Sequence, residues 1–348
     1  METRKLGTTD LDVSVLCLGT MMYGDQIKEA DAIAQMDVSI DRGINFFDTA
    51  ELYTVPPKPP TQGESERIIG RWMKTRANRH KVILATKVTG RSPMNWFREG
   101  GVPTRLSREH ILFAVERSLK NLQTDYIDLY QLHWPDRKVG VFGASFSGYD
   151  HYDDDYISYE ETLSTLNDLV KAGKVRHVGL SNETPYGTMQ FLKLAEQKDW
   201  PRMQSIQNVY NFMSREFDLG LAEIAFEEKV GLLAYSPMAQ GVLSGKYLGG
   251  SKPAGSRGAV FGRLERYQTP AAERAIRAYV ALAEELGVDP SALANQFVTT
   301  RKFLTSNIFG ARGMDQLETV FQSLEIKWTD DIEKRVTQIH REAPNPCP

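Results

Sequence analysis

Residues 45–53 have the sequence Asn-Phe-Phe-Asp-Thr-Ala-Glu-Leu-Tyr, in which a short apolar run becomes polar at Asp48. The apolar part is typical of a strand that is buried on both faces, and Asp48 stands where that strand should end. Tyr53 follows five residues later. Taken alone, this stretch is equally compatible with an ordinary loop acid and a tyrosine at an interface.

Two other predicted strands also end in titratable residues. Lys87 closes the apolar run at residues 81–87, and His133 closes the run at residues 126–133. The carboxyl ends of the strands in a (β/α) barrel converge on one face, where active sites lie. We therefore expect Asp48, Lys87 and His133 to belong to one site.

The composition limits the classes of protein that are possible. The chain has 348 residues, of which 41% are hydrophobic, and α/β barrels of this length form a single domain, here residues 1–348. A formal net charge of −3 provides no basic field that would attract nucleic acid. Cys17 and Cys347 form neither a disulfide framework nor a metal-binding spacing. No signal-peptide core and no apolar run near the ~18 residues of a membrane span are present, so we expect a cytoplasmic protein without membrane contact.

Predicted strands and helices alternate along the chain. The strands are expected at residues 14–18, 44–48, 82–87, 126–133, 175–180, 205–209, 231–235 and 307–309. Each is followed by a helix, such as residues 107–122, where Ser107 is the expected N-cap, or residues 216–228. Residues 238–267 are expected to form a long glycine-rich loop. Eight such units predict a parallel sheet closed into a (β/α)8 TIM barrel, with an N-terminal β-hairpin and two extra helices. No Gly-x-Gly-x-x-Gly follows the first strand, which argues against a Rossmann nucleotide site.

Residues 136–157 form the least regular segment. They include five aromatic residues among glycines and aspartates: Phe142, Phe146, Tyr149, Tyr152 and Tyr156. Loops of this length are usually functional or disordered. We expect this loop to form one wall of the substrate pocket, with an oligomer contact as the alternative. The acidic run at residues 153–155 beside His151 could suggest a cation site, but clustered loop acids are usually solvated, and no metal is predicted.

The residues at the first strand ends suit proton transfer. A free phenol, with a pKa of about 10, is a weak acid catalyst at neutral pH. A lysine ammonium ~4 Å from Tyr53 would favour the phenolate by up to about 4 kcal/mol at an effective dielectric constant of 20. Asp48 would keep Lys87 charged, and His133 would donate a hydrogen bond to a substrate oxygen. Together they would protonate or deprotonate an oxygen atom.

The remaining strand ends suit a nucleotide. Amide and hydroxyl groups and one flat ring follow the middle strands: Ser181, Asn182, Gln207 and Tyr210. Groups that bind phosphate oxygens follow the last two strands: Ser236, Lys246 and Arg312. An acid that protonates a carbonyl, beside these two walls, indicates hydride transfer from a nicotinamide cofactor. The alternative is a helix cap at residues 181–182 and solvated charges at Lys246 and Arg312.

Several motifs occur in order along almost the whole chain: FDTAELY at 47–53, ATK at 85–87, LQTDYIDLYQLHWP at 122–135, GLSNE at 179–183, AYSP at 234–237, GVLSGKY at 241–247 and GAR at 310–312. In these motifs the chain resembles the aldo-keto reductases. The loop at residues 55–63 makes it similar to the bacterial Tas-like NADP(H)-dependent members in particular. The resemblance implies a TIM barrel that reduces an aldehyde or ketone to an alcohol with NADPH.

The resemblance also implies roles for single residues. The catalytic tetrad, with Tyr53 as the acid, corresponds to Asp48, Tyr53, Lys87 and His133. The residues that hold the nicotinamide carboxamide correspond to Ser181, Asn182 and Gln207, and the stacking ring corresponds to Tyr210. The pyrophosphate side corresponds to Ser236, Gly241 and Lys246, and the 2′-phosphate end corresponds to Arg312 and Gln316.

Two departures from the family pattern concern the cofactor. Gly313 stands where a hydroxyl residue is frequent, and Val320 stands where many relatives have an asparagine that contacts adenine. The resemblance therefore implies hydride transfer more firmly than a preference for NADP over NAD.

Two other functions fit parts of the pattern. Potassium-channel β subunits resemble this family and keep a nucleotide site while acting as partners of another protein, but this sequence lacks a long N-terminal extension. A barrel glycosidase that uses Asp48 or Glu51 would leave the lysine, the histidine and the amide-lined wall without a role. The sequence names neither the carbonyl substrate nor the oligomeric state.

Overall fold

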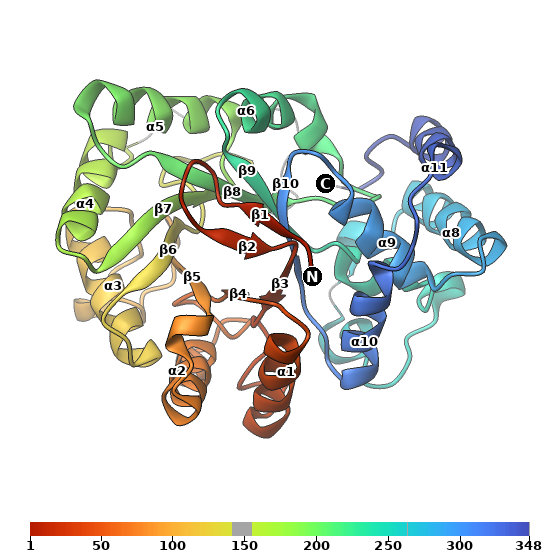
Figure 1. The fold of residues 1–348 in the computed structure, drawn as a ribbon, viewed down its shortest axis with the longest axis horizontal. Helices are drawn as coiled ribbons and strands as arrows, with labels where there is room; N and C mark the ends of the chain where they lie inside the picture. Colours follow the sequence, from red (N-terminus) through yellow and green to blue (C-terminus); the bar gives the residue numbers. More distant parts are fainter. Residues whose placement is uncertain (141–154, 263, 348) are drawn as a thin grey trace.

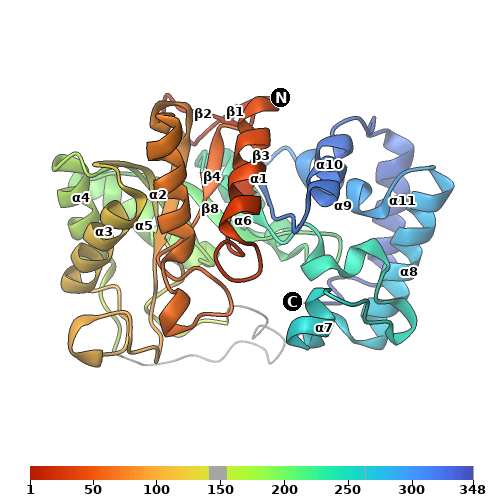
Figure 2. The same ribbon diagram turned by 90° about the horizontal axis from the view of Figure 1, so that it is seen from below.

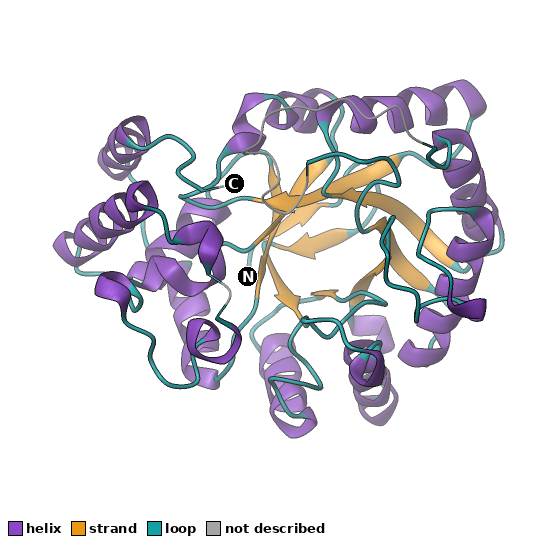
Figure 3. Ribbon diagram, turned by 180° about the vertical axis from the view of Figure 1, so that it is seen from behind, coloured by secondary structure: helices purple, strands orange, loops and turns teal. Residues whose placement is uncertain are grey.

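The computed structural model describes residues 1–140, 155–262 and 264–347. Eight parallel strands close into a barrel in the neighbour order β10-β3-β4-β5-β6-β7-β8-β9, which confirms the predicted TIM barrel. Helices surround the strands on the outside, as Figures 1 and 3 show from opposite faces. The barrel strands are β3 (Leu16–Gly19), β4 (Phe46–Asp48), β5 (Ile83–Val88), β6 (Ile127–Leu132), β7 (Val175–Ser181), β8 (Met203–Val209), β9 (Gly231–Tyr235) and β10 (Leu304–Phe309).

The N-terminal hairpin covers one end of the barrel. Strands β1 (Thr3–Lys5) and β2 (Asp12–Ser14) pair antiparallel, and the chain enters β3 two residues after Ser14. Leu6 and Val13 are buried in one apolar cluster with Cys17 and Phe46 of the barrel interior. Figure 2 shows this hairpin at one end and the long loops at the other. The hairpin closes the end of the barrel where the strands begin, so the site must lie at their carboxyl ends.

Apolar side chains that point out of the barrel pack against the helices, as Phe47 of β4 stacks on Trp72 with ring centroids 5.4 Å apart. Ser107 caps its helix as predicted, because its hydroxyl accepts a hydrogen bond from the amide of His110. The helices are α1 (Glu29–Asp41), α2 (Glu64–Arg76), α3 (Arg108–Leu122), α4 (Tyr159–Lys171), α5 (Pro185–Lys198), α6 (Leu221–Glu227), α7 (Arg257–Phe261), α8 (Pro270–Glu285), α9 (Pro290–Thr299), α10 (Met314–Ser323) and α11 (Asp330–Glu342). Within the described ranges, no helix is both long and apolar enough to cross a membrane.

Two segments differ from the sequence-based expectation. The helix predicted over residues 216–228 is broken at Gly220, whose backbone is not helical, so that only a 3-10 turn and the short α6 form. The segment 238–267, expected as a loop, contains α7, which begins where the Ser256 hydroxyl accepts from the amide of Ala259. A local cap therefore produced a helical turn that the glycine-rich composition did not predict.

Helices α2 and α3 approach each other closely at Gly70. A Cβ atom added there would lie 2.3 Å from the carbonyl oxygen of Asn121 and 2.7 Å from the carbonyl carbon of Leu122. Both atoms belong to the backbone at the end of α3, so neither can turn away. The contact fixes α2, which also carries Ser65, a hydrogen-bond partner of Thr49 in the loop after β4.

We expect Gly70→Ala to destabilise the protein, although alanine is normally the better helix former by up to about 1 kcal/mol. Overpacking against the backbone of α3 should lower the free energy of unfolding by about 1–3 kcal/mol, as measured by denaturant titration. Thr75→Ala on the exposed side of α2 is the matched control and should change stability little. Equal stability of the two variants would contradict the close packing.

Candidate active site

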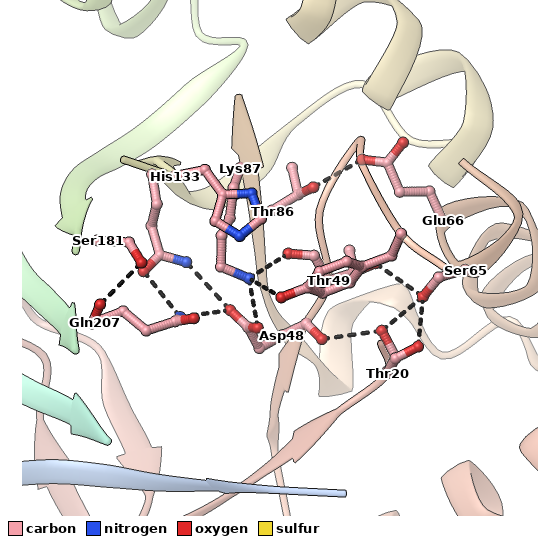
Figure 4. Close-up of polar contacts among 12 residues, drawn as sticks. Thr20, Asp48, Thr49, Ser65, Glu66, Thr86, Lys87, His133, Ser181 and Gln207 are labelled. Atoms are coloured by element: carbon pink, nitrogen blue, oxygen red, sulfur yellow. Dashed lines mark hydrogen bonds and ion pairs between the residues drawn. The ribbon is translucent and has the colours of Figure 1, made fainter. Parts of the chain in front are cut away.

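Four residues predicted to share a site lie together at the carboxyl ends of β4, β5 and β6. The ammonium of Lys87 donates to Asp48 Oδ2 at 2.6 Å and lies 3.2 Å from the phenol oxygen of Tyr53. The ring of His133 meets the ring of Tyr53 edge-on, with centroids 5.8 Å apart. All four side chains are buried or nearly so, and Figure 4 shows how Asp48, Lys87 and His133 face one another.

The loop after β4 brings Tyr53 back over the barrel. The amide of Thr49 donates to the carbonyl oxygen of Ala85, so the loop first continues alongside β5. The amide of Tyr53 then donates to the carbonyl oxygen of Ala50, which closes a turn. Lys87 contacts the same loop, because its ammonium donates to the carbonyl oxygen of Thr49 at 2.8 Å. The lysine therefore holds both the acid and the phenol in place.

Burial and neighbouring charges act in opposite directions on the pKa values of Tyr53 and Lys87, and the stronger of the two effects differs between them. Burial raises the pKa of Tyr53 above its ordinary value, and the charge of Lys87 only partly opposes this effect. The predicted influence of the lysine is therefore present but smaller than the cost of burying a phenolate. Burial lowers the pKa of Lys87, but the charges of Asp48 and Tyr53 outweigh it, so that the pKa is raised and the ammonium persists. The site thus keeps a neutral phenol beside a cation.

His133 is neutral near pH 7. Burial lowers its pKa well below the ordinary value, and the charge of Lys87 lowers it further. A neutral imidazole carries one N–H group, which it can donate to an oxygen atom without adding charge. His133 is therefore suited to orient and polarise a carbonyl oxygen, while Tyr53 holds the proton to be transferred.

Two glutamine amides complete the surroundings of Asp48. Gln207 Nε2 donates to Asp48 Oδ1 at 2.8 Å, and Gln131 Nε2 donates to the same atom at 3.2 Å. Gln131 was missed in the sequence, although strand alternation from His133 places it on the inner face of β6. Gln207 was expected to hold a carboxamide, but its amide nitrogen is engaged with Asp48 and with Gln131 Oε1 at 3.2 Å.

A second polar row lies beside His133. Asn182 Nδ2 donates to the carbonyl oxygen of His133 at 2.9 Å, and Ser181 Oγ donates to the carbonyl oxygen of Gln207 at 2.8 Å. The phenol of Tyr235 donates to Asn182 Oδ1 at 2.7 Å. The ends of the middle strands therefore present a connected row of amide and hydroxyl groups, and the contact of residues 181 and 182 with a carboxamide stays a prediction.

The expectation that Tyr210 stacks on a nicotinamide ring is corrected by the structure. Tyr210 is fully buried, stacked on Phe297 with centroids 5.6 Å apart and met edge-on by Phe303. Its hydroxyl donates to Asp218 Oδ1 at 3.0 Å. It has no free face for a ligand, because β8 ends at Val209 and the next residue turns into the core. The partly exposed tyrosine at this wall is Tyr235. Its position in the AYSP motif is the feature of the sequence from which it could have been predicted.

The segment after β9 has an unusual backbone conformation. Ser236, Gln240 and Gly241 have φ values of 56°, 60° and 92°, which is unusual for the two residues that are not glycine. A Cβ added at Gly241 would lie 3.3 Å from the ammonium of Lys246. The φ of Gly241 is one that other residues rarely adopt, and a side chain there would also crowd the end of the exposed Lys246.

Arg312 and Gln316 lie together at the start of α10. The amide of Arg312 donates to Gln316 Oε1 at 3.0 Å, and its guanidinium donates to Gln26 Oε1 at 2.8 Å. The N-cap residue, Gly313, provides no side-chain cap for the first amides of α10, and Asp315 is the acidic residue in the first turn. Gln26 was missed in the sequence. Val320 is buried and packs in the core.

Apolar side chains surround Tyr53 on the outer side. Phe97 is buried in this cluster, and five partly buried residues pack around it: Met21, Val55, Met94, Trp96 and Trp134. Trp96 and Trp134 therefore belong to the same apolar group as Tyr53. The predictions for residues 141–154, which include most of the aromatic loop and the possible cation site at His151, lie outside the described residues. In the part of the chain that is described, no group of three or more possible metal ligands occurs.

Comparisons with known proteins identify the family of the chain. A family model described as the Aldo/keto reductase family matches residues 15–341. The protein Tas of Escherichia coli is 43% identical over the full length of both chains. An uncharacterised oxidoreductase, YrpG of Bacillus subtilis, is 32% identical over 97% of this chain and 96% of its own. A probable voltage-gated potassium channel subunit beta of rice is 29% identical over 94% of this chain and 92% of its own. The sequence-based resemblance is confirmed, and the chain belongs to the aldo/keto reductase family.

Proposed function

We propose that the protein is an NADPH-dependent oxidoreductase that reduces an aldehyde or a ketone to an alcohol, with Tyr53 as the general acid. The observation that carries this proposal is the contact between the phenol of Tyr53 and the buried ammonium of Lys87, beside a neutral His133. Such an arrangement supplies a proton to an oxygen atom and offers no nucleophile to a carbon. The substrate is a small carbonyl compound.

The residues present suit a nicotinamide cofactor. The wall formed by Ser181, Asn182 and Tyr235 combines amide and hydroxyl groups with a partly exposed ring. Lys246 and Arg312, with the uncapped start of α10, supply positive charge for phosphate groups. We assign the nicotinamide end to the wall and the phosphates to the basic end. When bound, the cofactor supplies a hydride to the carbonyl carbon.

The chain itself manages the proton. Tyr53 donates its phenolic proton to the carbonyl oxygen, which receives a hydrogen bond from the neutral His133 in the same step. Lys87 stabilises the phenolate that remains, because its ammonium lies 3.2 Å from the phenol oxygen. Asp48 holds this ammonium and is itself held by two glutamine amides. The pocket wall around Tyr53, with Trp96 and Trp134, favours flat or apolar carbonyl compounds.

A regulatory barrel is the second candidate function. It is favoured by the similarity to the rice protein named as a potassium channel subunit beta. A regulatory barrel would bind NADPH without multiple turnovers. Measuring NADPH oxidation with a panel of aldehydes and ketones distinguishes the two functions, since only a reductase consumes the cofactor continuously.

We expect Tyr53→Phe to lower kcat for carbonyl reduction by roughly 100-fold or more, because no other phenol contacts Lys87 among the described residues. The affinity for NADPH, measured by fluorescence titration, should stay close to wild type. Lys87→Met should also be severely impaired, and Asp48→Asn less so, since only the ammonium touches the phenol. A Tyr53→Phe rate within about tenfold of wild type would be incompatible with this role.

We expect Arg312→Ala to raise the dissociation constant for NADPH about tenfold or more, because a charge-assisted hydrogen bond contributes roughly 1.5–3 kcal/mol. Binding of NADH, which lacks the 2′-phosphate, should change little. Lys246→Ala is the matched control on the pyrophosphate side and should weaken both cofactors. Equal losses for NADPH and NADH in Arg312→Ala would show that this residue does not distinguish them.

Making the same change at Tyr235 and at Tyr210 tests which of the two rings contacts the cofactor. Tyr235→Leu should weaken NADPH binding by about 0.5–1.5 kcal/mol, the contribution of an aromatic contact, with little change in Tm. Tyr210→Leu should lower stability by about 2 kcal/mol, because it leaves a space beside Phe297, and should keep NADPH affinity. The reverse pattern would restore Tyr210 as the cofactor residue.

A further inference from the structure

A buried ion pair lies directly behind the loop that carries Tyr53. Glu51 is fully buried and Arg98 is 5% exposed. The guanidinium donates to Glu51 Oε2 at 2.9 Å and to Oε1 at 2.8 Å, a bidentate contact. Two charges removed from water stabilise a fold only if their geometry is excellent, and apolar residues of similar size often serve stability as well. Such a pair beside a reacting group therefore calls for a role besides stability.

Glu51 joins the Tyr53 loop to the end of β5. Its amide donates to the carbonyl oxygen of Lys87 at 3.2 Å, which adds one rung after the contact between Thr49 and Ala85. Its carboxylate then accepts from the amide of Thr89 at 2.7 Å. The carboxylate of Glu51 thus replaces the backbone carbonyl group that would accept the next hydrogen bond between the loop and β5. Glu51 therefore fixes the backbone on both sides of Lys87, whose ammonium contacts Tyr53.

Arg98 joins the same loop to the apolar side of the site. It follows Phe97, whose buried ring belongs to the apolar cluster around Tyr53, and it donates to the carbonyl oxygen of Phe97 at 3.3 Å. Gln62 Nε2 donates to the carbonyl oxygen of Glu51 at 3.0 Å. The ion pair thus links the loop after β4 to the loop after β5, and these two loops surround the phenol.

We propose that Glu51 and Arg98 are positioning residues that hold the phenol of Tyr53 at its working distance from Lys87. The inference rests on the proposed function of Tyr53 as the general acid. Neither residue reaches the reacting atoms, since Glu51 is occupied by Arg98 and Thr89. Their effect is on geometry, and a displacement of about 1 Å between reacting groups can cost roughly 100-fold in rate. Loosening the pair should therefore lower kcat without loss of cofactor affinity.

The test separates geometry from stability. Arg98→Met leaves the carboxylate of Glu51 buried without a positively charged partner, so both Tm and kcat should fall. In the double variant Glu51→Gln/Arg98→Met the unpaired charge is removed, so Tm should return close to wild type. We expect its kcat with NADPH and 4-nitrobenzaldehyde to stay roughly 10- to 100-fold low, with NADPH affinity unchanged. A kcat that recovers together with Tm would show that the pair serves stability alone and would overturn the proposal.

Arg98→Lys keeps the test decisive if the double variant does not fold. Lysine preserves the charge but cannot form the bidentate contact. We expect kcat between wild type and Arg98→Met at a Tm close to wild type. A wild-type kcat in Arg98→Lys would overturn the proposal by the same reasoning.

The pair of Arg79 and Asp128 is a matched control at the opposite end of the barrel. Arg79 Nη2 donates to Asp128 Oδ2 at 2.7 Å, and the carboxylate also accepts from the amide of Leu84, as Glu51 accepts from an arginine and a backbone amide. Asp128 differs in having a second arginine partner, since Arg176 donates to its Oδ1 at 2.8 Å. Arg79→Met should lower Tm and leave kcat at the wild-type value.

Tyr53→Phe separates the general-acid role of Tyr53 from the positioning role of Glu51 and Arg98. If Tyr53→Phe is inactive while the double variant is fully active, only the positioning role fails.

Discussion

The contact between Lys87 and Asp48 is the constraint on which the rest of the site depends. An ammonium with no exposed surface needs a negative partner, and here the two atoms are 2.6 Å apart. The carboxylate in turn needs donors for its second oxygen, which Gln131 and Gln207 supply. The strands β4, β5, β6 and β8 therefore each place one polar side chain at the same level along the barrel axis, in an otherwise apolar interior. This requirement fixes where the charged groups of the candidate site lie.

The loops around Asp48 and Lys87 complete the candidate active site. The loop after β4 continues the ladder beside β5 and then turns back, so that the phenol of Tyr53 meets the ammonium from outside. Burial keeps the phenol protonated, and the lysine lowers the cost of losing that proton. The balance of these two effects is what a general acid requires: a proton that is held at rest and released to a substrate oxygen.

The basic end of the site is connected to the same loop. Gln26 accepts from the guanidinium of Arg312 at 2.8 Å and donates to the carbonyl oxygen of Val55 at 2.8 Å. Val55 belongs to the apolar cluster around Tyr53. One side chain thus spans from the start of α10, where a phosphate is proposed to bind, to the wall of the carbonyl pocket.

The sequence alone determined the barrel and the residues at its strand ends. Strand and helix periods are local properties, and the ends of parallel strands converge whatever their loops do, so Asp48, Lys87 and His133 could be predicted to meet. Tertiary structure decided what local patterns do not contain. Tyr210 and Tyr235 follow strands in similar ways, but contacts with Phe297 bury one ring, whereas Asn182 holds the other at the site. The pairing of Glu51 with Arg98 likewise joins separate loops. The direction of a side chain in a loop depends on residues distant in the chain, and only the folded structure brings them together.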